Sequence, residues 1–234
     1  MALVIILLID IVIASCCGHY SIEPIKCVKI YFLSPFGYEG DWSALDETVL
    51  LNIRMPRIIA AIIVGISLAI SGASYQSVFQ NPLISPDILG VSSGACVGAA
   101  IAILLHLSRP YIMIFAFVIG VLTVILTMTI PRILKSESNM MLVLSGIIVG
   151  GLASSVMGII KYVADSQSEL PQIVYWTMGS LDDISYKEII LALIPISLCV
   201  IVLIKMSWWI DVISMGEKDA KTLGANIKKL DLLQ

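Results

Sequence analysis

Two arginines stand at the start of a long apolar stretch, where charged side chains are unusual. Arg54 and Arg57 are three residues apart in the run LLNIRMPRIIAAIIVGISLAISGA. Residues with this spacing are neighbours on a helix surface, so the two guanidinium groups are predicted to point the same way. The planar guanidinium fork is suited to bidentate pairing with a carboxylate. The residues alone do not identify the binding partner of the two arginines. Extension of their side chains to lipid headgroups is one alternative.

The residue combinations that usually carry catalysis are missing from the apolar stretches. None of these stretches holds an interior histidine, a pair of carboxylates or a serine–lysine dyad. Ser145 lies in an LSG triplet like that of intramembrane proteases, but no histidine stands at a matching depth. The sequence also has no G-x-x-x-x-G-K-[ST] phosphate loop. We therefore predict no catalytic residue, no cofactor and no nucleotide site.

Ionisable groups and cysteines give no further chemistry. Asp10 is an isolated acidic residue inside an apolar stretch, so a proton- or sodium-coupled carrier is poorly supported. If the chain is a transporter, its energy comes from a partner. The five cysteines form no C-x-x-C pair and have no metal-ligand spacing, so we predict no metal site. We interpret them as small apolar residues, with a disulfide from Cys16 or Cys17 to Cys27 as the alternative.

Composition indicates which elements must position these residues. The chain of 234 residues is 59% hydrophobic and 13% charged, whereas soluble domains average about 45–50% and about 25%. A membrane-spanning helix needs ~20 mostly apolar residues. The apolar residues gather in six blocks that reach or approach this length: Ala2–Gly18, Arg57–Phe79, Ile88–Leu107, Tyr111–Ile130, Met141–Val163 and Glu188–Ile204. We predict an all-α, polytopic transmembrane helical bundle over residues 1–204 and a separate polar segment over residues 205–234.

Charge adds two restrictions to this prediction. A net charge of −3 gives no indication of nucleic-acid binding. The 14 lysines and arginines divide evenly between the two sides of the predicted bundle, so the positive-inside rule leaves its orientation open. The first block contains IVIASC, similar to a bacterial lipoprotein cleavage box, but it lacks a basic start and is interrupted by Asp10. We therefore favour a first transmembrane helix over a signal peptide.

Small residues recur four apart along three of the predicted spans. In lipid, helices associate through close backbone approach rather than through hydrophobic gain, so such stripes indicate tight packing of the second, third and fifth spans. The predicted packing positions are Gly65 and Ala69 in the second span, Gly90, Gly94 and Gly98 in the third, and Gly146, Gly150 and Gly158 in the fifth.

The polar tail contains a short predicted helix. The run SMGEKDAKTLGANIKKL is bounded by Gly216 and Gly224, with Glu217 near the positive end of the helix. Ala220 and Leu223 fall on one face of this helix. On these residues alone the segment is either a solvated amphipathic helix or a binding element for a partner.

The sequence resembles a known family across most of its length. The run RMPRIIAAIIVGISLAISGASYQSVFQNPLISPDILGVSSGACVGA, followed in order by LVLSGIIVGG, YWTMGSL and SMGEKDAKTLG, is similar to the FecCD-type (BtuC-like) permeases. These are the membrane subunits of ATP-binding-cassette (ABC) importers for ferric siderophores, haem and cobalamin. The resemblance extends from about Trp42 to Leu230. It implies the fold of type II ABC importer permeases, which have about ten spans with an inverted repeat.

The resemblance also implies roles for particular residues. The N-terminus would be cytoplasmic, so Arg54 and Arg57 would lie on the outer face and dock acidic residues of an extracytoplasmic substrate-binding protein. The tail would insert into a groove of a cytoplasmic ATPase, and the loop before the fifth span would form a second constriction of the path besides the NPL motif. The residues implied in coupling are Gly216, Glu217, Ala220, Leu223 and Gly224, and those implied in the translocation gate are Asn81, Leu83, Ser138 and Asn139.

We thus expect a permease subunit of the cytoplasmic membrane, working as a homodimer with an ATPase dimer and a binding protein. Ferric siderophore is the expected cargo, with haem and cobalamin as alternatives. Two departures from the family are the absence of a basic N-terminal lead and of the later group of spans, since the sequence ends at Gln234. We therefore expect these residues to be unable to transport alone. A non-transporting membrane scaffold, a half-permease or a decayed fragment is the alternative.

Overall fold

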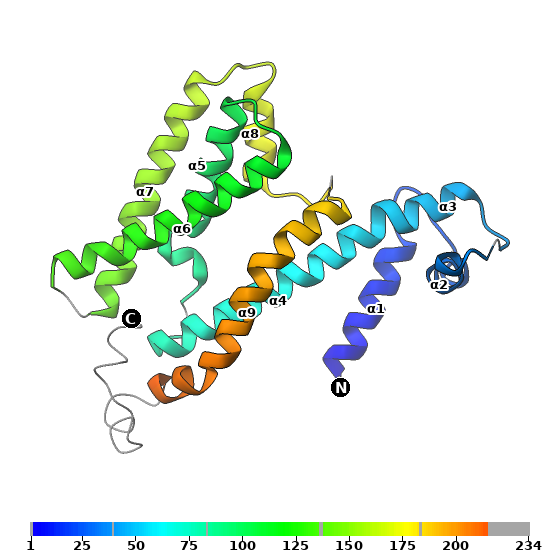
Figure 1. Cartoon of the computed structure of the whole chain (residues 1–234), viewed down its shortest axis with the longest axis horizontal. Helices are drawn as coiled ribbons and strands as arrows, with labels where there is room; N and C mark the ends of the chain where they lie inside the picture. The colour runs from blue at the N-terminus through cyan, green and yellow to red at the C-terminus, as the bar shows by residue number, and fades with distance from the viewer. Residues whose placement is uncertain (1, 39, 83, 136–137, 183, 215–234) are drawn as a thin grey trace. The chain divides into compact units, whose positions relative to one another are not determined.

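A computed structural model of the chain describes residues 2–38, 40–82, 84–135, 138–182 and 184–214. These ranges are helical and contain no β-strand (Figure 1). The α-helices are α1 (Ala2–Cys16), α2 (Pro24–Leu33), α3 (Ala44–Thr48), α4 (Met55–Phe79), α5 (Val91–Leu104), α6 (Arg109–Ile133), α7 (Asn139–Val163), α8 (Glu169–Met178) and α9 (Tyr186–Ser214). Three shorter helical segments are η1 (Ser34–Phe36), η2 (Val49–Arg54) and η3 (Pro86–Leu89).

The prediction of an all-α membrane bundle is confirmed, with a difference in the lengths of its helices. Four helices of the described ranges are long and apolar enough to cross a membrane: Ala44–Phe79, Arg109–Ile133, Met140–Val163 and Tyr186–Val212. The first and third predicted spans correspond to α1 and α5, which are apolar but have only 15 and 14 residues. Helix α5 is short because Gly90 adopts a left-handed conformation, with φ of 76°, directly before it.

The second span begins earlier than its apolar residues indicate. Helical structure starts at Ala44, because the Ser43 hydroxyl accepts a hydrogen bond from the Asp46 N–H while the Asp46 carboxylate accepts one from the Ser43 N–H. Before Pro56 the helix widens into the π-helical segment η2. A proline ring removes one backbone donor and clashes with the carbonyl one turn earlier, and a wider turn relieves that clash.

Contacts divide the chain into two compact units. The first unit comprises the described residues of Met1–Ile66 and Leu181–Ile196. Its core lies where the end of α1, the start of α2 and η2 meet. The buried residues of this core are Cys16, Ile22, Cys27, Ile30 and Leu50.

The second unit comprises the described residues of Ser67–Ser180 and Ser197–Gln234. Helices α5, α6, α7 and α8 pack together in it (Figure 1). Ile173 of α8 is fully buried, so α8 packs against the other helices through this side chain, whereas Tyr175 and Trp176 at the start of YWTMGSL are exposed. The core residues are Val97, Ala100, Ile103, Met157, Ile160, Ala164 and Ile173.

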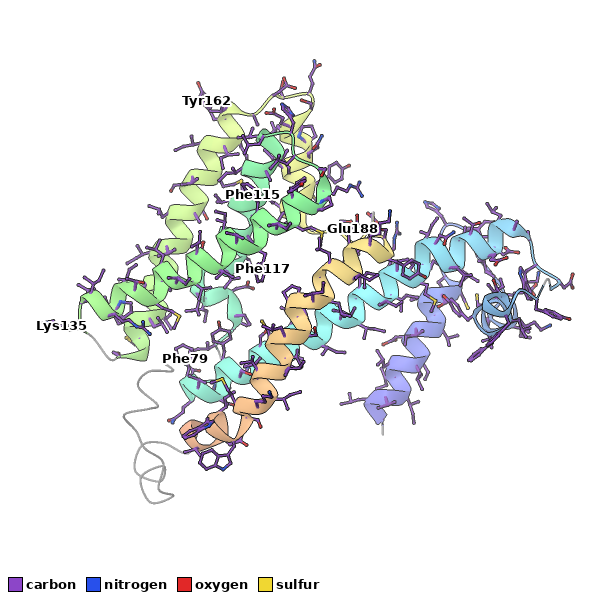
Figure 2. All side chains as sticks on the ribbon, viewed as in Figure 1. Phe79, Phe115, Phe117, Lys135, Tyr162 and Glu188 are labelled. Atoms are coloured by element: carbon purple, nitrogen blue, oxygen red, sulfur yellow. The ribbon has the colours of Figure 1, made fainter. Side chains whose placement is uncertain are left out.

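Large apolar side chains also cover the outer faces of the second unit. Phe117 of α6 is 54% exposed and Tyr162 of α7 is 91% exposed (Figure 2). Ile147, Leu152 and Ile159 of α7 are likewise exposed. Apolar outer faces on long helices are expected when lipid or further helices replace water as the surroundings.

Helix α9 extends beyond the predicted end of the sixth span. It continues past Ile204 to Ser214 and carries Trp208 and Trp209, whose rings meet edge to face at 4.8 Å. Tryptophans are enriched where membrane helices enter the headgroup region. The predicted coupling residues, Gly216, Glu217, Ala220, Leu223 and Gly224, lie outside the described residues.

Candidate functional site

Arg54 binds the end of the N-terminal helix. It is the last residue of η2, and its guanidinium group donates hydrogen bonds to the carbonyl oxygens of Ser15 and Tyr20. Ser15 lies in the last turn of α1, where carbonyl groups lack partners within the helix and the helix dipole is negative. A guanidinium cation satisfies both needs. Arg54 therefore holds α1 against the rest of the first unit.

Arg57 instead forms an ion pair with Asp182. One of its terminal nitrogens lies 3.3 Å from the Asp182 carboxylate. Its Nε and its other terminal nitrogen donate to the Asp182 carbonyl oxygen at 3.1 and 2.5 Å. The Asp182 side chain is 80% exposed and that of Arg57 is 40% exposed. Such an exposed ion pair contributes only ~0–1 kcal/mol, so another carboxylate can replace it at little cost.

The two arginines therefore bind different segments of the first unit. Arg54 follows the wide π-helical turn, while Arg57 belongs to the regular helix that begins after it. The change in winding between them alters their relative direction from that of two residues on one regular helix. The structure places both on the first unit, where Arg57 presents a guanidinium group already paired with a carboxylate.

A polar depression lies beside the carbonyl group that Arg54 binds. It has a volume of about 410 Å³ and is lined by Tyr20, Ser21, Ile22, Glu23, Lys26 and Asp46. The Tyr20 hydroxyl donates to the Asp46 carboxylate at 2.8 Å, which ties the loop after α1 to α3. Lys26 pairs with Glu23 at 3.8 Å. Charges of both signs, on Glu23, Lys26 and Asp46, therefore line the depression beside the Tyr20 carbonyl that Arg54 binds.

The predicted gate residues follow or precede long helices of the second unit. Asn81 lies two residues after the end of α4, and Gln80 between them adopts a left-handed conformation with φ of 50°. The Asn81 N–H donates to the Gln76 carbonyl at 3.2 Å. Ser138 is the N-cap residue of α7, its carbonyl accepting from the Met141 N–H at 2.9 Å, and Asn139 is the first residue of that helix. Leu83 lies outside the described residues.

Two of the predicted glycine stripes lie at close backbone contacts. A Cβ atom on Gly146 would overlap the carbonyl oxygen of Ile88 in η3. A Cβ on Gly94 would overlap the hydroxyl of Thr123, and one on Gly98 would overlap the carbonyl oxygen of Phe115. The glycine stripe of α5 thus faces α6. This helix is the fourth predicted span, whereas tight packing was predicted only among the second, third and fifth spans.

The other predicted packing positions differ in their surroundings. Gly90 and Gly150 face each other, and a Cβ on Gly90 would lie 3.4 Å from the Gly150 nitrogen. Among the described residues, nothing lies within 4 Å of a Cβ built on Gly65 or Gly158. Ala69 of α4 is exposed. Gly65, in the first unit, and Ala69, in the second, are therefore not close-packing positions among the described residues.

The short segment before α5 is held from two sides. The Ile88 carbonyl lies against Gly146 of α7, and the buried Leu89 carbonyl accepts a hydrogen bond of 3.0 Å from the Thr127 hydroxyl of α6. Backbone carbonyls that carry no intrahelical hydrogen bond require such partners in an apolar environment. Segment η3 is therefore built into the packing of α6 and α7.

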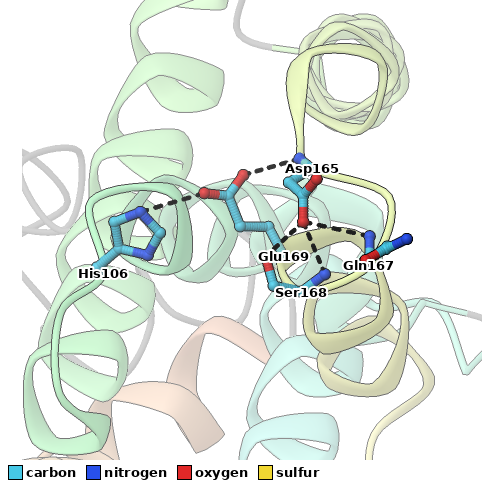
Figure 3. A network of polar contacts seen from close by, with 5 residues as sticks. All are labelled: His106, Asp165, Gln167, Ser168 and Glu169. Atoms are coloured by element: carbon cyan, nitrogen blue, oxygen red, sulfur yellow. Dashed lines mark hydrogen bonds and ion pairs between the residues drawn. The ribbon is translucent and has the colours of Figure 1, made fainter.

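A polar network missed in the sequence analysis joins two connections of the second unit (Figure 3). The Asp165 carboxylate accepts from the backbone N–H groups of Gln167 and Ser168 at 3.2 and 2.9 Å and from the Ser168 hydroxyl at 2.6 Å. The hydrogen bonds from Ser168 hold the pKa of Asp165 below its usual range. The Glu169 carboxylate accepts from the Asp165 N–H at 3.0 Å and lies 3.3 Å from His106.

This network is structural in character. It starts α8 and links the α7–α8 connection to the α5–α6 connection, where His106 stands. The signal in the sequence is DSQSE, an acidic residue followed four positions later by a glutamate that opens a helix. Within the described ranges, no three histidine, cysteine or acidic side chains come together as a metal site.

Comparisons with known proteins agree on one family. The FecCD transport family profile matches residues 4–234. The molybdate import system permease MolB of Haemophilus influenzae is 32% identical over 228 residues, which cover 97% of this chain and 67% of MolB. A Helicobacter pylori protein named a probable iron chelatin transport system permease is 38% identical over 199 residues, covering 85% of this chain and 58% of that protein. Other relatives are named for vitamin B12 and hemin import.

A solved structure agrees as well. It is assigned to the metal-chelate type of ABC transporter in an inward-facing conformation, and it matches this chain with a TM-score of 0.81 at 31% identity. The match covers 99% of this chain and 69% of that chain. This chain thus spans between 58% and 69% of the lengths of these three proteins. The chain belongs to the FecCD transport family and is a multi-pass membrane protein of the ABC permease kind.

Proposed function

We propose that this chain is the permease subunit of an ABC importer in the cytoplasmic membrane and that it carries a ferric siderophore or a related metal chelate, such as haem or cobalamin. The observation that carries this proposal is the family match over residues 4–234, together with the TM-score of 0.81 to a metal-chelate type ABC transporter. Relatives named for molybdate, iron chelatin, vitamin B12 and hemin support the transport class without selecting one cargo.

Transport by such a subunit is vectorial and requires partners. A second copy of the permease, a cytoplasmic ATPase dimer and an extracytoplasmic binding protein complete the assembly. ATP binding closes the ATPases, and this movement reaches the permease through the proposed coupling residues Gly216, Glu217, Ala220, Leu223 and Gly224. ATP hydrolysis belongs to the ATPase, so the permease itself is not an enzyme.

The contacts of the two arginines support a division of labour in docking. Arg57 pairs with an exposed carboxylate, which a carboxylate of the binding protein can replace. Arg54 binds two backbone carbonyls at the end of α1 and positions the same outer surface. Docking therefore rests mainly on Arg57, with Arg54 as a supporting contact.

The gate residues occupy the connections where a constriction can open and close. Asn81 and Leu83 belong to the NPL motif of the sequence, and Ser138 and Asn139 stand at the start of α7. We assign them to two constrictions of the translocation path. Small rotations of α4 or α7 would move these residues at the helix ends.

The test is ATP-driven uptake in proteoliposomes. The native permease is reconstituted with its ATPase and binding protein, and accumulation of a radiolabelled ferric siderophore is compared with that of haem, cobalamin and molybdate. ATP-dependent accumulation of one metal chelate supports the proposal, whereas accumulation of molybdate alone overturns the cargo assignment. Absence of any ATP-dependent uptake favours a non-transporting scaffold or a decayed copy.

A pull-down separates the scaffold from the permease. In detergent extracts, the ATPase is expected to co-purify with the native protein and to be lost from a Leu223→Asp variant. Lys205→Gln, outside the coupling residues, is the matched control. Equal co-purification of the ATPase with the native protein and with the Leu223→Asp variant would contradict the coupling role.

A further inference from the structure

Two cysteines from different helices meet in the core of the first unit. Cys16 is the last residue of α1, and Cys27 lies in α2, eleven residues further on. Their sulfur atoms are 3.5 Å apart, and the two residues are only 9% and 2% exposed. The turn between the two helices brings these thiols together although ten residues separate them in the sequence.

Several contacts independent of the sulfur atoms hold this turn in place. The Ile22 N–H donates to the Cys16 carbonyl at 3.3 Å, and the Tyr31 hydroxyl donates to the Ser15 hydroxyl at 3.0 Å. Arg54 clamps the carbonyls on both sides of Cys16. Two thiols that are already positioned lose little conformational freedom when they join, which favours oxidation over the reduced pair.

We propose that Cys16 and Cys27 form a disulfide bond that ties α1 to α2 in the mature membrane protein. The oxidant is an exported protein disulfide. One of the two cysteine thiolates attacks it to form a mixed disulfide, and the other then displaces the oxidant's sulfur. The two cysteines lose two hydrogens and two electrons, which leave on the two thiols of the reduced oxidant.

The compartment for this bond rests on the proposed function. If the N-terminus is cytoplasmic, the end of α1 and the start of α2 lie outside the cytoplasm, where disulfides persist. The bond forms during membrane insertion, before the core closes, because burial raises the pKa of the Cys27 thiol to about 12 and makes it a poor nucleophile in the folded protein. The same burial then protects the bond from reductants.

Site-resolved alkylation tests the proposal on native membranes. Samples are quenched in acid, denatured and alkylated with a light reagent, then reduced and alkylated with a heavy one. Cys16 and Cys27 are expected to carry the heavy label, and Cys17, Cys96 and Cys199 the light one. In a Cys16→Ser variant, Cys27 should carry the light label. In the control Cys17→Ser, Cys16 and Cys27 should both still carry the heavy label. Light label on both Cys16 and Cys27, or heavy label on Cys17, overturns the assignment.

A second readout separates failure of the bond from failure of the proposed orientation. Cys17 is exposed and follows Cys16 directly, so a membrane-impermeant maleimide added to spheroplasts reports its side of the membrane. Labelling of Cys17 with both core thiols reduced overturns the disulfide and leaves the permease orientation intact. Labelling of Cys17 only after lysis overturns the orientation, and the disulfide proposal fails with it.

Discussion

At the scale of single residues, Arg54 and Arg57 hold different groups although only two residues separate them. Arg54 neutralises the carbonyl end of α1, whereas Arg57 meets the exposed carboxylate of Asp182. Their residue type and their position before the apolar stretch were evident in the sequence. Their partners could not be predicted, because they depend on how α1 and the segment before α9 return to the same region in space.

Charge reversal at Arg57 is expected to weaken docking of the binding protein. Arg57→Glu, introduced in the native permease, should raise the dissociation constant by roughly tenfold at low salt, because an attraction becomes a repulsion. The salt dependence of binding should also fall. Surface plasmon resonance on nanodiscs measures both quantities. Arg132→Glu, on another helix, is the control, and an unchanged affinity of Arg57→Glu would exclude the docking role.

The Asp165 network is expected to make stability depend on pH. Hydrogen bonds lower the pKa of Asp165 in the folded protein, so its stabilising effect is fully present above the ordinary aspartate pKa. The effect is lost as pH falls through the lowered pKa. Asp165→Ala should therefore reduce the melting temperature at neutral pH, and the difference from the native protein should shrink in acid. Equal melting temperatures at neutral pH would contradict this role.

At the scale of elements, the helices were predictable and their irregular parts were not. Blocks of apolar residues indicated where the long helices lie, because a helix that spans a bilayer core must be apolar over most of its length. The π-helical turn before Pro56 and the left-handed conformation of Gly90 depend on local backbone geometry that hydropathy does not report. The glycine stripes indicated close approach on α5 and α7, but α6 as the partner of Gly94 and Gly98 required the three-dimensional arrangement.

A substitution on α7 measures the contact between this helix and η3. Gly146→Ala is expected to destabilise the protein by about 1–3 kcal/mol, because the new methyl group overlaps the Ile88 carbonyl. Gly151→Ala on the same helix is the matched control, since no described atom lies within 4 Å of its Cβ. That control should be neutral or stabilising by up to about 1 kcal/mol. Thermal unfolding in detergent compares the two, and equal effects would show that the contact is not formed.

At the scale of the whole molecule, the exposed apolar surface defines where the chain resides. Helices α6, α7 and α9 present large aliphatic and aromatic side chains outward, and their charged residues gather near the helix ends. A soluble protein reverses this arrangement. Residence in a membrane could be predicted from composition alone, because it depends on the overall fractions of apolar and charged residues rather than on particular contacts. The partners in a complete transporter are properties of several chains and need experiments on the assembly.

Cysteine accessibility checks this arrangement in the membrane. Cys199 lies within α9 and is exposed in the isolated chain. In native membranes it should resist an impermeant maleimide and react with that reagent only after denaturation in detergent, because lipid or neighbouring helices cover it. Cys17, in the loop after α1, serves as the accessible reference. Rapid labelling of Cys199 by the impermeant reagent would place this part of α9 in water.

The two glycines at η3 are required for different reasons, and this difference sets how the protein tolerates mutation. At position 90 the obstacle is a backbone angle, since a Cβ atom there would lie 3.4 Å from the Gly150 nitrogen, an ordinary contact distance. At position 146 the obstacle is space, and any side chain meets the Ile88 carbonyl. In a saturation library selected for uptake, asparagine is therefore expected as the surviving replacement at position 90, since it tolerates left-handed angles best. At position 146, glycine alone is expected among the surviving variants.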